Sequence, residues 1–397
     1  MRITVLCTDL GVRIPGDKGA SMHLGSITKA FAECGHDVQL VAIAGHGEPD
    51  ALLRTLADHV LVPHPGRAEG IERERNKLDT VEYVVDEIGP QVAAFGPDVI
   101  YERLSLFGSA GLRIAASCPS PVRHVVEVNA LVAEEEATWR GLHQAELARR
   151  VERRVLEAAD LVVAVSNEVA EQVGAVAPAT PTAVVPNGVE LDRFFTQFPG
   201  TRPAPSSGFL RTPCSPGSSV PCGRGTEDLA LEALARTESG WHLAIAGDGP
   251  IRVVGAPGAR GRTHPESALP RSPRPRAGGD LARRGGRQLA PYPALDGFAF
   301  SPLKLYEYLA AGTRSSPARS DRSPRRSAMA GGALVPAGDV GGLAAARRPC
   351  RRAEEGQCNR PSRLASTPIA RTAGRRAADI VERAGRIAPL GLCAGGR

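Results

Sequence analysis

The first half of the chain alternates short apolar runs with longer segments of helical periodicity. Residues 2–7 form an apolar run, and a set of apolar residues then recurs at the spacing of a helix that Gly35 ends. These residues are Leu24, Ile27, Phe31 and Cys34. The next apolar run covers 38–43. A strand, a helix and a strand of these lengths form a βαβ unit, which requires a parallel sheet.

The same alternation continues to about residue 188 and predicts a doubly wound α/β sheet. Further strands are predicted at 60–62, 99–101, 122–128, 161–165 and 183–185. Helical segments are predicted around 68–95, 106–117, 133–158 and 167–174. Because ligands of such sheets bind beyond the carboxyl ends of the strands, we expect functional side chains in the loops that follow them.

In the second half, short segments with a helix or strand period are separated by segments that have neither period. A helix is predicted at 226–235, a strand at 241–246, and a strand, turn and helix over 334–346. The segments between them are rich in Arg, Pro, Ser and Gly, and they follow neither a strand nor a helix period. These segments are 206–223, 252–286, 314–326 and 347–371.

Length and pattern together predict two domains. A chain of 397 residues is too long for one ordinary core. We assign the first domain to 1–187, a proline-containing linker to 188–207, the second domain to 208–372 and a tail to 373–397. The second domain is expected to be incomplete or partly disordered, because the irregular segments fall inside it.

Composition narrows the function classes. No apolar run approaches the ~20 residues of a membrane span, and no cleavage-site pattern follows 1–7, so we expect a cytoplasmic protein. The eight cysteines show no two-residue spacing, which favours free thiols over a metal site. The net charge is +6, but aromatic residues make up only 4%, which argues against a nucleic-acid partner. A cationic face that meets anionic lipid at the inner side of a membrane fits this charge better.

The segment 290–312 predicts an anion site. Asp296 and Gly297 are typical of a turn, and Ser301 and Pro302 are typical of the first positions of a helix. The free amides and the dipole of a helix that begins at Leu303 suit a phosphate. Glu307, about one turn further on, can accept hydrogen bonds from a ribose. The alternative is an ordinary capped helix that packs on a sheet.

This segment resembles the nucleotide-sugar-binding segment of glycosyltransferase family four, whose members carry two glutamates separated by seven residues. Glu307 matches the second glutamate, and the first falls at Ala299. The glycine-rich loop at 16–19, the turn at 185–189 and the turn at 247–250 also resemble segments of that family.

The resemblance implies a GT-B architecture of two Rossmann-like domains and a retaining transfer of a sugar from a nucleoside diphosphate donor to a hydroxyl of a glycan, lipid carrier or small molecule. No cofactor and no metal are implied. By the same resemblance the catalytic residues are Glu307, Lys304 and Asn129. The donor-binding residues are Ser301, Leu303, Lys304, Glu307, Arg224 and Gly249, and the acceptor-side loop contributes Gly16, Lys18 and Gly19.

Four residues of the first domain are interpreted one by one. Many family members place a histidine at the position of Asn129, and an asparagine can bind a sugar hydroxyl but cannot act as a base. We interpret Glu127 as a paired carboxylate at a strand end. Lys18 is predicted to be solvated, with assistance to a phosphate as the alternative, and His23 is predicted to be a residue of the helix face.

The second domain departs from the family pattern, and this leaves other functions open. The upstream arginine position holds Ser219, and the lysine position holds Arg224. We interpret the irregular segments as shifted reading frames in a GC-rich gene, with the true frame regained at about 225, 288 and 333, and natural disordered insertions are the alternative. A catalytically dead nucleotide-binding remnant and a nucleotide-sugar epimerase remain alternative functions.

Overall fold

The structure is a computed structural model of the chain. It describes residues 1–16, 18–46, 53, 56 and 58–188 in the first half. In the second half it describes 208–213, 226–236, 241–246, 287–290, 315–319, 335–336, 338–345 and 376–383.

The described part of the first half is built on a parallel sheet of eight strands, as the βαβ pattern predicted. The strands are β1 (Arg2–Leu6), β2 (Arg13–Ile14), β3 (Asp37–Ala44), β4 (Asp58–Val62), β5 (Val99–Arg103), β6 (Arg123–Val128), β7 (Leu161–Ala164) and β8 (Thr182–Val184). Their order is β2-β3-β1-β5-β6-β7-β8, and β4 pairs with β3. The chain crosses from β3 to the other side of β1 at β5, so the sheet is doubly wound.

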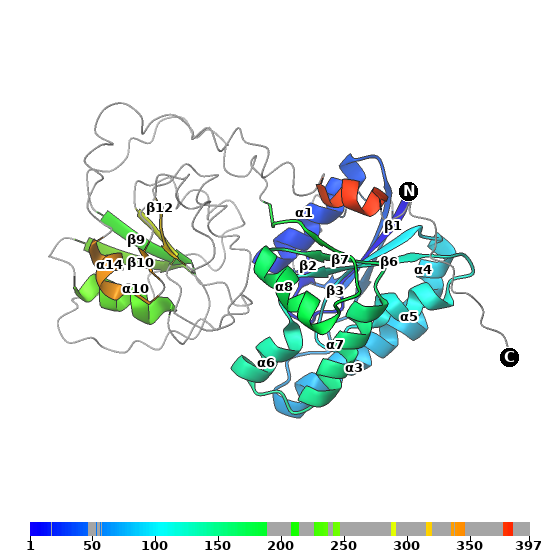
Figure 1. Ribbon diagram of the computed structural model, residues 1–397. Coiled ribbons are helices and arrows are strands. Elements are labelled where there is room, and N and C mark those ends of the chain that lie inside the picture. Colours follow the sequence, from blue (N-terminus) through cyan, green and yellow to red (C-terminus); the bar gives the residue numbers. More distant parts are fainter. Residues whose placement is uncertain are drawn as a thin grey trace.

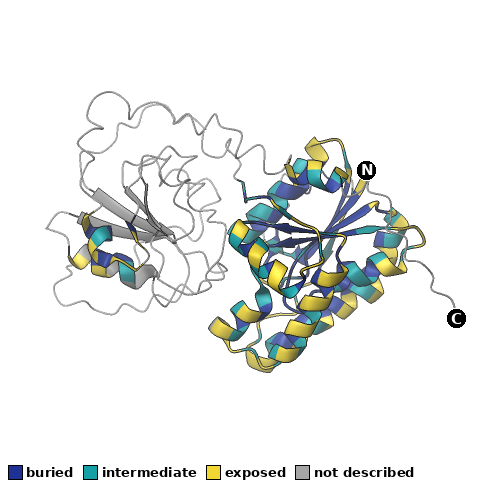
Figure 2. Cartoon of the chain, viewed as in Figure 1, coloured by how far each residue is buried: buried dark blue, intermediate teal, exposed yellow. Residues whose placement is uncertain are grey.

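Helices cover both faces of this sheet. They are α1 (Gly19–Glu33), α3 (Gly70–Tyr83), the π-helix η1 (Val84–Ile88), α4 (Gly89–Phe95), α5 (Ala110–Ser117), α6 (Val132–Arg140), α7 (Ala145–Ala158) and α8 (Asn167–Val176). Figure 1 shows α1 on one face and α3, α5 and α7 on the other. Buried residues gather on the strands and on the helix sides that face them (Figure 2).

Each face has its own core. Leu24, Ile27 and Phe31 of α1 pack with Ile3 and Tyr101 on one side. On the other side Ile100 packs with residues of α3, η1, α4 and α5, and Val126 packs with residues of α7 and α8. The apolar strands therefore bury both faces, which is the property of a parallel sheet covered by crossover helices.

Several boundaries differ from the sequence prediction. The helix predicted at 133–158 is divided into α6 and α7, because Gly141 adopts a φ of 67° that continues neither helix. The prediction for Cys34 was wrong: it lies just past the end of α1 and is exposed. The prediction missed β2, since two residues are too few to show a period.

The described part of the second half contains a second parallel sheet. Its strands are β9 (Gly208–Pro213), β10 (Trp241–Ala246), β11 (Arg287–Ala290), β12 (Ser315–Arg319) and β13 (Val335–Pro336), in the order β10-β9-β11-β12-β13. Its helices are α10 (Thr226–Ala235) and α14 (Val340–Ala345), whose buried residues pack with Val335. The prediction that 206–223 and 314–326 lack regular structure was wrong where β9 and β12 form.

A helical segment at 376–383 packs on the first domain. Ala377, Ala378 and Val381 are buried in the same core as the residues of α1. Nε2 of His36 lies 3.4 Å from an oxygen of Glu382. The sequence analysis assigned no element here, but the segment completes the core on the α1 face. Across the described residues, no helix combines the length and the apolar character needed to span a bilayer.

Candidate active site

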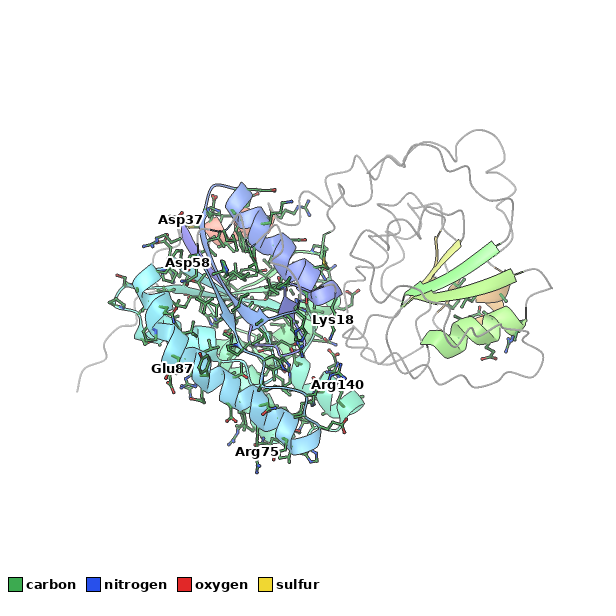
Figure 3. All side chains as sticks on the ribbon, turned by 180° about the vertical axis from the view of Figure 1, so that it is seen from behind. Lys18, Asp37, Asp58, Arg75, Glu87 and Arg140 are labelled. Carbon is green, nitrogen blue, oxygen red and sulfur yellow. The ribbon has the colours of Figure 1, made fainter. Side chains whose placement is uncertain are left out.

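Polar side chains lie together at the carboxyl ends of the strands of the first sheet. Lys18 and Arg140 lie at this end of the domain, and Asp37 and Asp58, at the starts of β3 and β4, lie at the opposite end (Figure 3). The loops that follow β1, β5, β6 and β8 therefore reach the edge where ligands of doubly wound sheets bind.

Glu127, near the end of β6, is the centre of this edge. Its side chain is 3% exposed, and four side chains donate hydrogen bonds to it. Nε2 of His23 and the hydroxyl of Tyr101 reach Oε2 at 2.9 and 2.8 Å, and Arg103 reaches Oε1 at 2.8 Å. The side-chain amide of Asn129 also donates to Oε1. The interpretation of Glu127 as a paired strand-end carboxylate is confirmed.

Glu127 is ionised despite its burial. Burial alone raises the pKa of a carboxyl group. The charges of His23 and Arg103 and the hydrogen bonds from His23 and Tyr101 lower the pKa of Glu127 by more than burial raises it. The pKa of Glu127 is therefore held well below its usual range. Burial and the neighbouring Glu127 charge raise the pKa of Tyr101 well above its usual value, so its hydroxyl remains a donor.

The carboxylate fixes the orientation of His23. An ionised carboxylate only accepts hydrogen bonds, so Nε2 of His23 carries the hydrogen that faces Glu127. In the neutral ring Nδ1 is then the acceptor atom. The prediction that His23 is only a residue of the helix face was incomplete: it lies on α1, but its ring is held at the sheet edge.

Asn129 lies at this edge, and its side chain already has protein partners. It donates to Glu127 and accepts a hydrogen bond from the side chain of Asn187, with 3.4 Å between Nδ2 and Oδ1. Asn187 lies in the turn at 185–189 and is 4% exposed. This contact joins the end of β6 to the turn after β8. The side chain of Asn187 therefore connects two segments, in addition to its place in the turn.

The loop at 16–19 approaches the same edge. A Cβ at Gly16 would lie 2.4 Å from the carbonyl oxygen of Arg13 and 2.8 Å from Oγ of Ser21, so a side chain does not fit there. Gly16 is therefore required by packing within the loop. Gly19 is the first residue of α1, and Lys18 is its N-cap residue. Lys18 is half-buried and not fully solvated as predicted, and its charge acts on His64.

Two further carboxyl groups at this edge have opposite pKa shifts. Burial raises the pKa of Asp9, but Lys77, whose Nζ lies 3.5 Å away, and the amide of Gly11 lower it to about 2. Burial, with Glu136 and Asp9 nearby, outweighs Arg140 and raises the pKa of Glu135 to about 7. One group is a carboxylate at neutral pH, and the other takes up a proton close to neutral pH.

The sequence analysis missed several residues of this edge. Two of them could have been found from the alternation of side chains along a strand. Tyr101 and Arg103 share one face of β5, and Arg103 is the register partner of Glu127. Residues two apart on a strand point to the same side, so both could have been placed beside Glu127 once β5 and β6 were paired.

The predicted donor site lies outside the described residues, and its roles stay predictions. It consists of Arg224, Gly249, Ser301, Leu303, Lys304 and Glu307. Within the described part of the chain, no group of three or more His, Cys, Asp or Glu side chains is placed to hold a metal ion.

The fold of the chain is similar to that of known proteins. The model of Glycosyltransferase Family 4 matches residues 18–193. A comparison of the sequence with curated proteins gives no match. Sucrose-phosphate synthase from Thermosynechococcus elongatus is a similar solved structure, with 16% identity, a TM-score of 0.61 and coverage of 96% of this chain and 94% of that one.

Two further solved structures share the fold. WaaG, a glycosyltransferase involved in lipopolysaccharide biosynthesis, has 14% identity and a TM-score of 0.61, and the match covers 96% of this chain and 99% of that one. A glycosyltransferase from Rickettsia africae has 10% identity and a TM-score of 0.59, with 98% and 99% covered. These similarities show that the chain has the GT-B fold. The family 4 match over residues 18–193 agrees with the resemblance found in the first domain.

Proposed function

We propose that the chain is a retaining glycosyltransferase that moves a sugar from a nucleoside diphosphate donor to a hydroxyl acceptor. The observation that carries the proposal is the family 4 match over 18–193. The polar edge centred on Glu127 supports it, because this edge lies where ligands of a doubly wound sheet bind.

In the proposed reaction the acceptor oxygen forms a bond to the anomeric carbon, and the bond from that carbon to the donor diphosphate breaks. The hydroxyl proton passes to the departing phosphate, so no strong protein base is required. The hydroxyl of Ser301, the amide of Leu303 and the ammonium group of Lys304, with help from Arg224, would stabilise the charge that develops on the diphosphate. Glu307 would hold the ribose. Gly249 would lie in the turn beside the donor.

The first domain would supply the acceptor side. When the His23 ring is neutral, its Nδ1 can accept a hydrogen bond from a sugar hydroxyl, because Glu127 fixes the hydrogen on Nε2. Asn129 has a second amide hydrogen that Glu127 does not use. Gly16, Lys18 and Gly19 would border the acceptor and the diphosphate. The proposal includes a cytoplasmic enzyme that meets a lipid carrier or another hydroxyl acceptor at the inner membrane face.

A panel of uridine and guanosine diphosphate sugars tests the function. The expected result is release of free nucleoside diphosphate, first by slow hydrolysis and faster once an acceptor is supplied. Proton NMR of the product should show the anomeric configuration of the donor. An inverted product would contradict the retaining mechanism, and epimerised donor without transfer would favour the epimerase.

A catalytically dead nucleotide-binding remnant is the second candidate. Ala299 and Ser219 favour it, since they stand where the family carries a glutamate and an arginine. Calorimetry with the same donors separates the two cases. Donor binding without release of sugar or nucleotide across the panel would identify the remnant. Resequencing of the gene tests the frameshift interpretation, which a clean read would remove.

A further inference from the structure

Three basic side chains meet at the ends of β2, β3 and β4, and we call them the Arg13 cluster: Arg13, His46 and His64. One terminal nitrogen of Arg13 lies 3.3 Å from Nε2 of His46, and the other lies 2.7 Å from Nε2 of His64. Nε of Arg13 donates to the carbonyl oxygen of Leu10 at 3.3 Å. A single guanidinium group thus holds two imidazole rings at the carboxyl edge of the sheet.

Positive charge in this cluster is not balanced by the described residues that touch it. Within 1–16, 18–46 and 58–188, no carboxylate contacts Arg13, His46 or His64. A guanidinium group stays protonated and only donates, and it usually faces a carboxylate or a phosphate. Here its two terminal nitrogens face imidazole rings, which are weak partners for a cation.

The state of His64 reflects this excess of positive charge. The pKa of His64 is lowered, first by burial and then by the charges of Arg13, His46 and Lys18. Together these effects outweigh a hydrogen bond to Leu10, which raises the pKa. The amide of Gly66 lies 2.9 Å from Nδ1 of His64, and Arg13, which can only donate, gives a hydrogen to Nε2. Arg13 has five N–H groups and uses three of them in these contacts with described residues, so two are left for a ligand.

The position of the cluster is fixed by its strands and open to a ligand. The main-chain amide of Arg13 donates to Oγ of Ser21, and Gly16 lies so near the Arg13 carbonyl that a Cβ would not fit between them. β2 pairs with the end of β3, and β3 pairs with β4, which brings the three side chains to one edge. His46 is exposed, and Arg13 and His64 are half-buried.

We propose that the Arg13 cluster binds a phosphoryl group carried by the acceptor, either on a soluble molecule or in a lipid. The acceptor role of the ligand rests on the proposed transferase function. The binding of a phosphoryl group rests on the cluster alone. A phosphoryl group has three oxygens and up to two negative charges, which match the two remaining N–H groups of Arg13, the Nδ1 hydrogen of the exposed His46 ring and the positive charge of the cluster. A carboxylate has two oxygens and would leave part of this donor set unused.

Histidine side-chain NMR of the full chain tests the site without any donor, with inorganic phosphate as the probe. Phosphate should raise the pKa of His64, because a bound anion offsets the charge of Arg13. The Arg13→Gln variant should bind phosphate about tenfold or more weakly, as expected when a charged hydrogen bond is lost. The Arg75→Gln variant is the matched control, because Arg75 lies on α3 away from Lys18 and pairs with Glu72 (Figure 3).

No response of His64 to phosphate would overturn the proposal, and so would equal binding by Arg13→Gln and the unaltered chain. Circular dichroism checks that Arg13→Gln is folded. If it is not, His46→Gln at the exposed ring replaces it, with a loss of about two- to tenfold expected. An equal response to acetate at matched ionic strength would overturn the assignment to a phosphoryl group.

Two further probes distinguish the source of the phosphoryl group. Glycerol 1-phosphate represents a soluble acceptor, and phosphatidylcholine vesicles with and without phosphatidic acid represent a lipid. A response to either that Arg13→Gln loses supports the site, and a response to neither overturns the acceptor role. Since none of these measurements needs a sugar donor, their failure and the failure of the transferase assay are separate results.

Discussion

His23 and Glu127 lie 104 positions apart in the chain, and their side chains meet with 2.9 Å between Nε2 and Oε2. The contact joins α1 to the end of β6. The carboxylate of Glu127 also accepts hydrogen bonds from Tyr101 and Arg103 of β5. One buried charge therefore connects α1, β5 and β6 at the candidate active site.

Replacement of Glu127 by alanine should destabilise the first domain strongly. The variant leaves the half-buried charge of Arg103 and the buried hydroxyl of Tyr101 without their acceptor, and removal of one partner of a buried pair costs about 3–5 kcal/mol. Urea denaturation followed by circular dichroism measures the change. Glu72→Ala, which breaks an exposed pair with Arg75, should change the free energy of unfolding by no more than about 0.5 kcal/mol. Equal stability of the two variants would contradict this assignment.

The sequence predicted much of the fold because its strands are continuous apolar runs. β1, β3, β5, β6 and β7 were all located to within about two residues, as buried parallel strands allow. The second sheet was harder, since β9 and β12 contain arginine, proline and serine and show no strand period. Composition alone could not separate those strands from an irregular segment.

The candidate site was only partly predictable. Asn129 and the loop at 16–19 followed from their positions after strands, because loops at the carboxyl ends of parallel strands meet at one edge. The contact of His23 with Glu127, and that of Arg13 with His46 and His64, depend on the order of the strands in space. A single sequence does not contain that order, so these contacts required the structure.

Replacement of Glu307 by alanine should weaken donor binding. Glu307 is predicted to accept hydrogen bonds from the ribose, and loss of hydrogen bonds to a charged group corresponds to about ten- to hundredfold in affinity. Calorimetric titration with the donor found in the panel measures the change. Glu146→Ala, on the exposed side of α7, is the control and should bind the donor as the unaltered chain does. Undiminished affinity in Glu307→Ala would rule out the ribose contact.

Replacement of Glu152 by glutamine should stabilise the domain at high pH and leave its stability unchanged at low pH. Burial raises the pKa of Glu152 to about 7 from a reference value of 4.5, so the folded state holds its proton more tightly than the unfolded state. The resulting stability is present below the reference pKa and is lost as pH rises through 7.

Glutamine keeps the acceptor for the amide of Ala133, which donates to Glu152 at 3.0 Å, and it does not ionise. The free energies of unfolding of Glu152→Gln and the unaltered chain should agree near pH 4 and differ by on the order of 1–3 kcal/mol at pH 8. Urea denaturation at the two pH values measures the difference. A difference that is constant with pH would show that Glu152 does not titrate as described.

Removal of the helical segment at 376–383 should destabilise the first domain, because Ala377, Ala378 and Val381 complete the core on the α1 face. A chain that ends at residue 372 exposes Phe31 and its neighbours, and Val381→Ala alone should cost about 1–3 kcal/mol by the loss of buried methyl groups. Thermal unfolding measures both changes. Asp379→Ala, at an exposed position of the same segment, is the control and should leave the melting temperature unchanged. If Val381→Ala melts as Asp379→Ala does, the segment does not contribute to the core in solution, and the first domain reaches its stability from residues 1–188 alone.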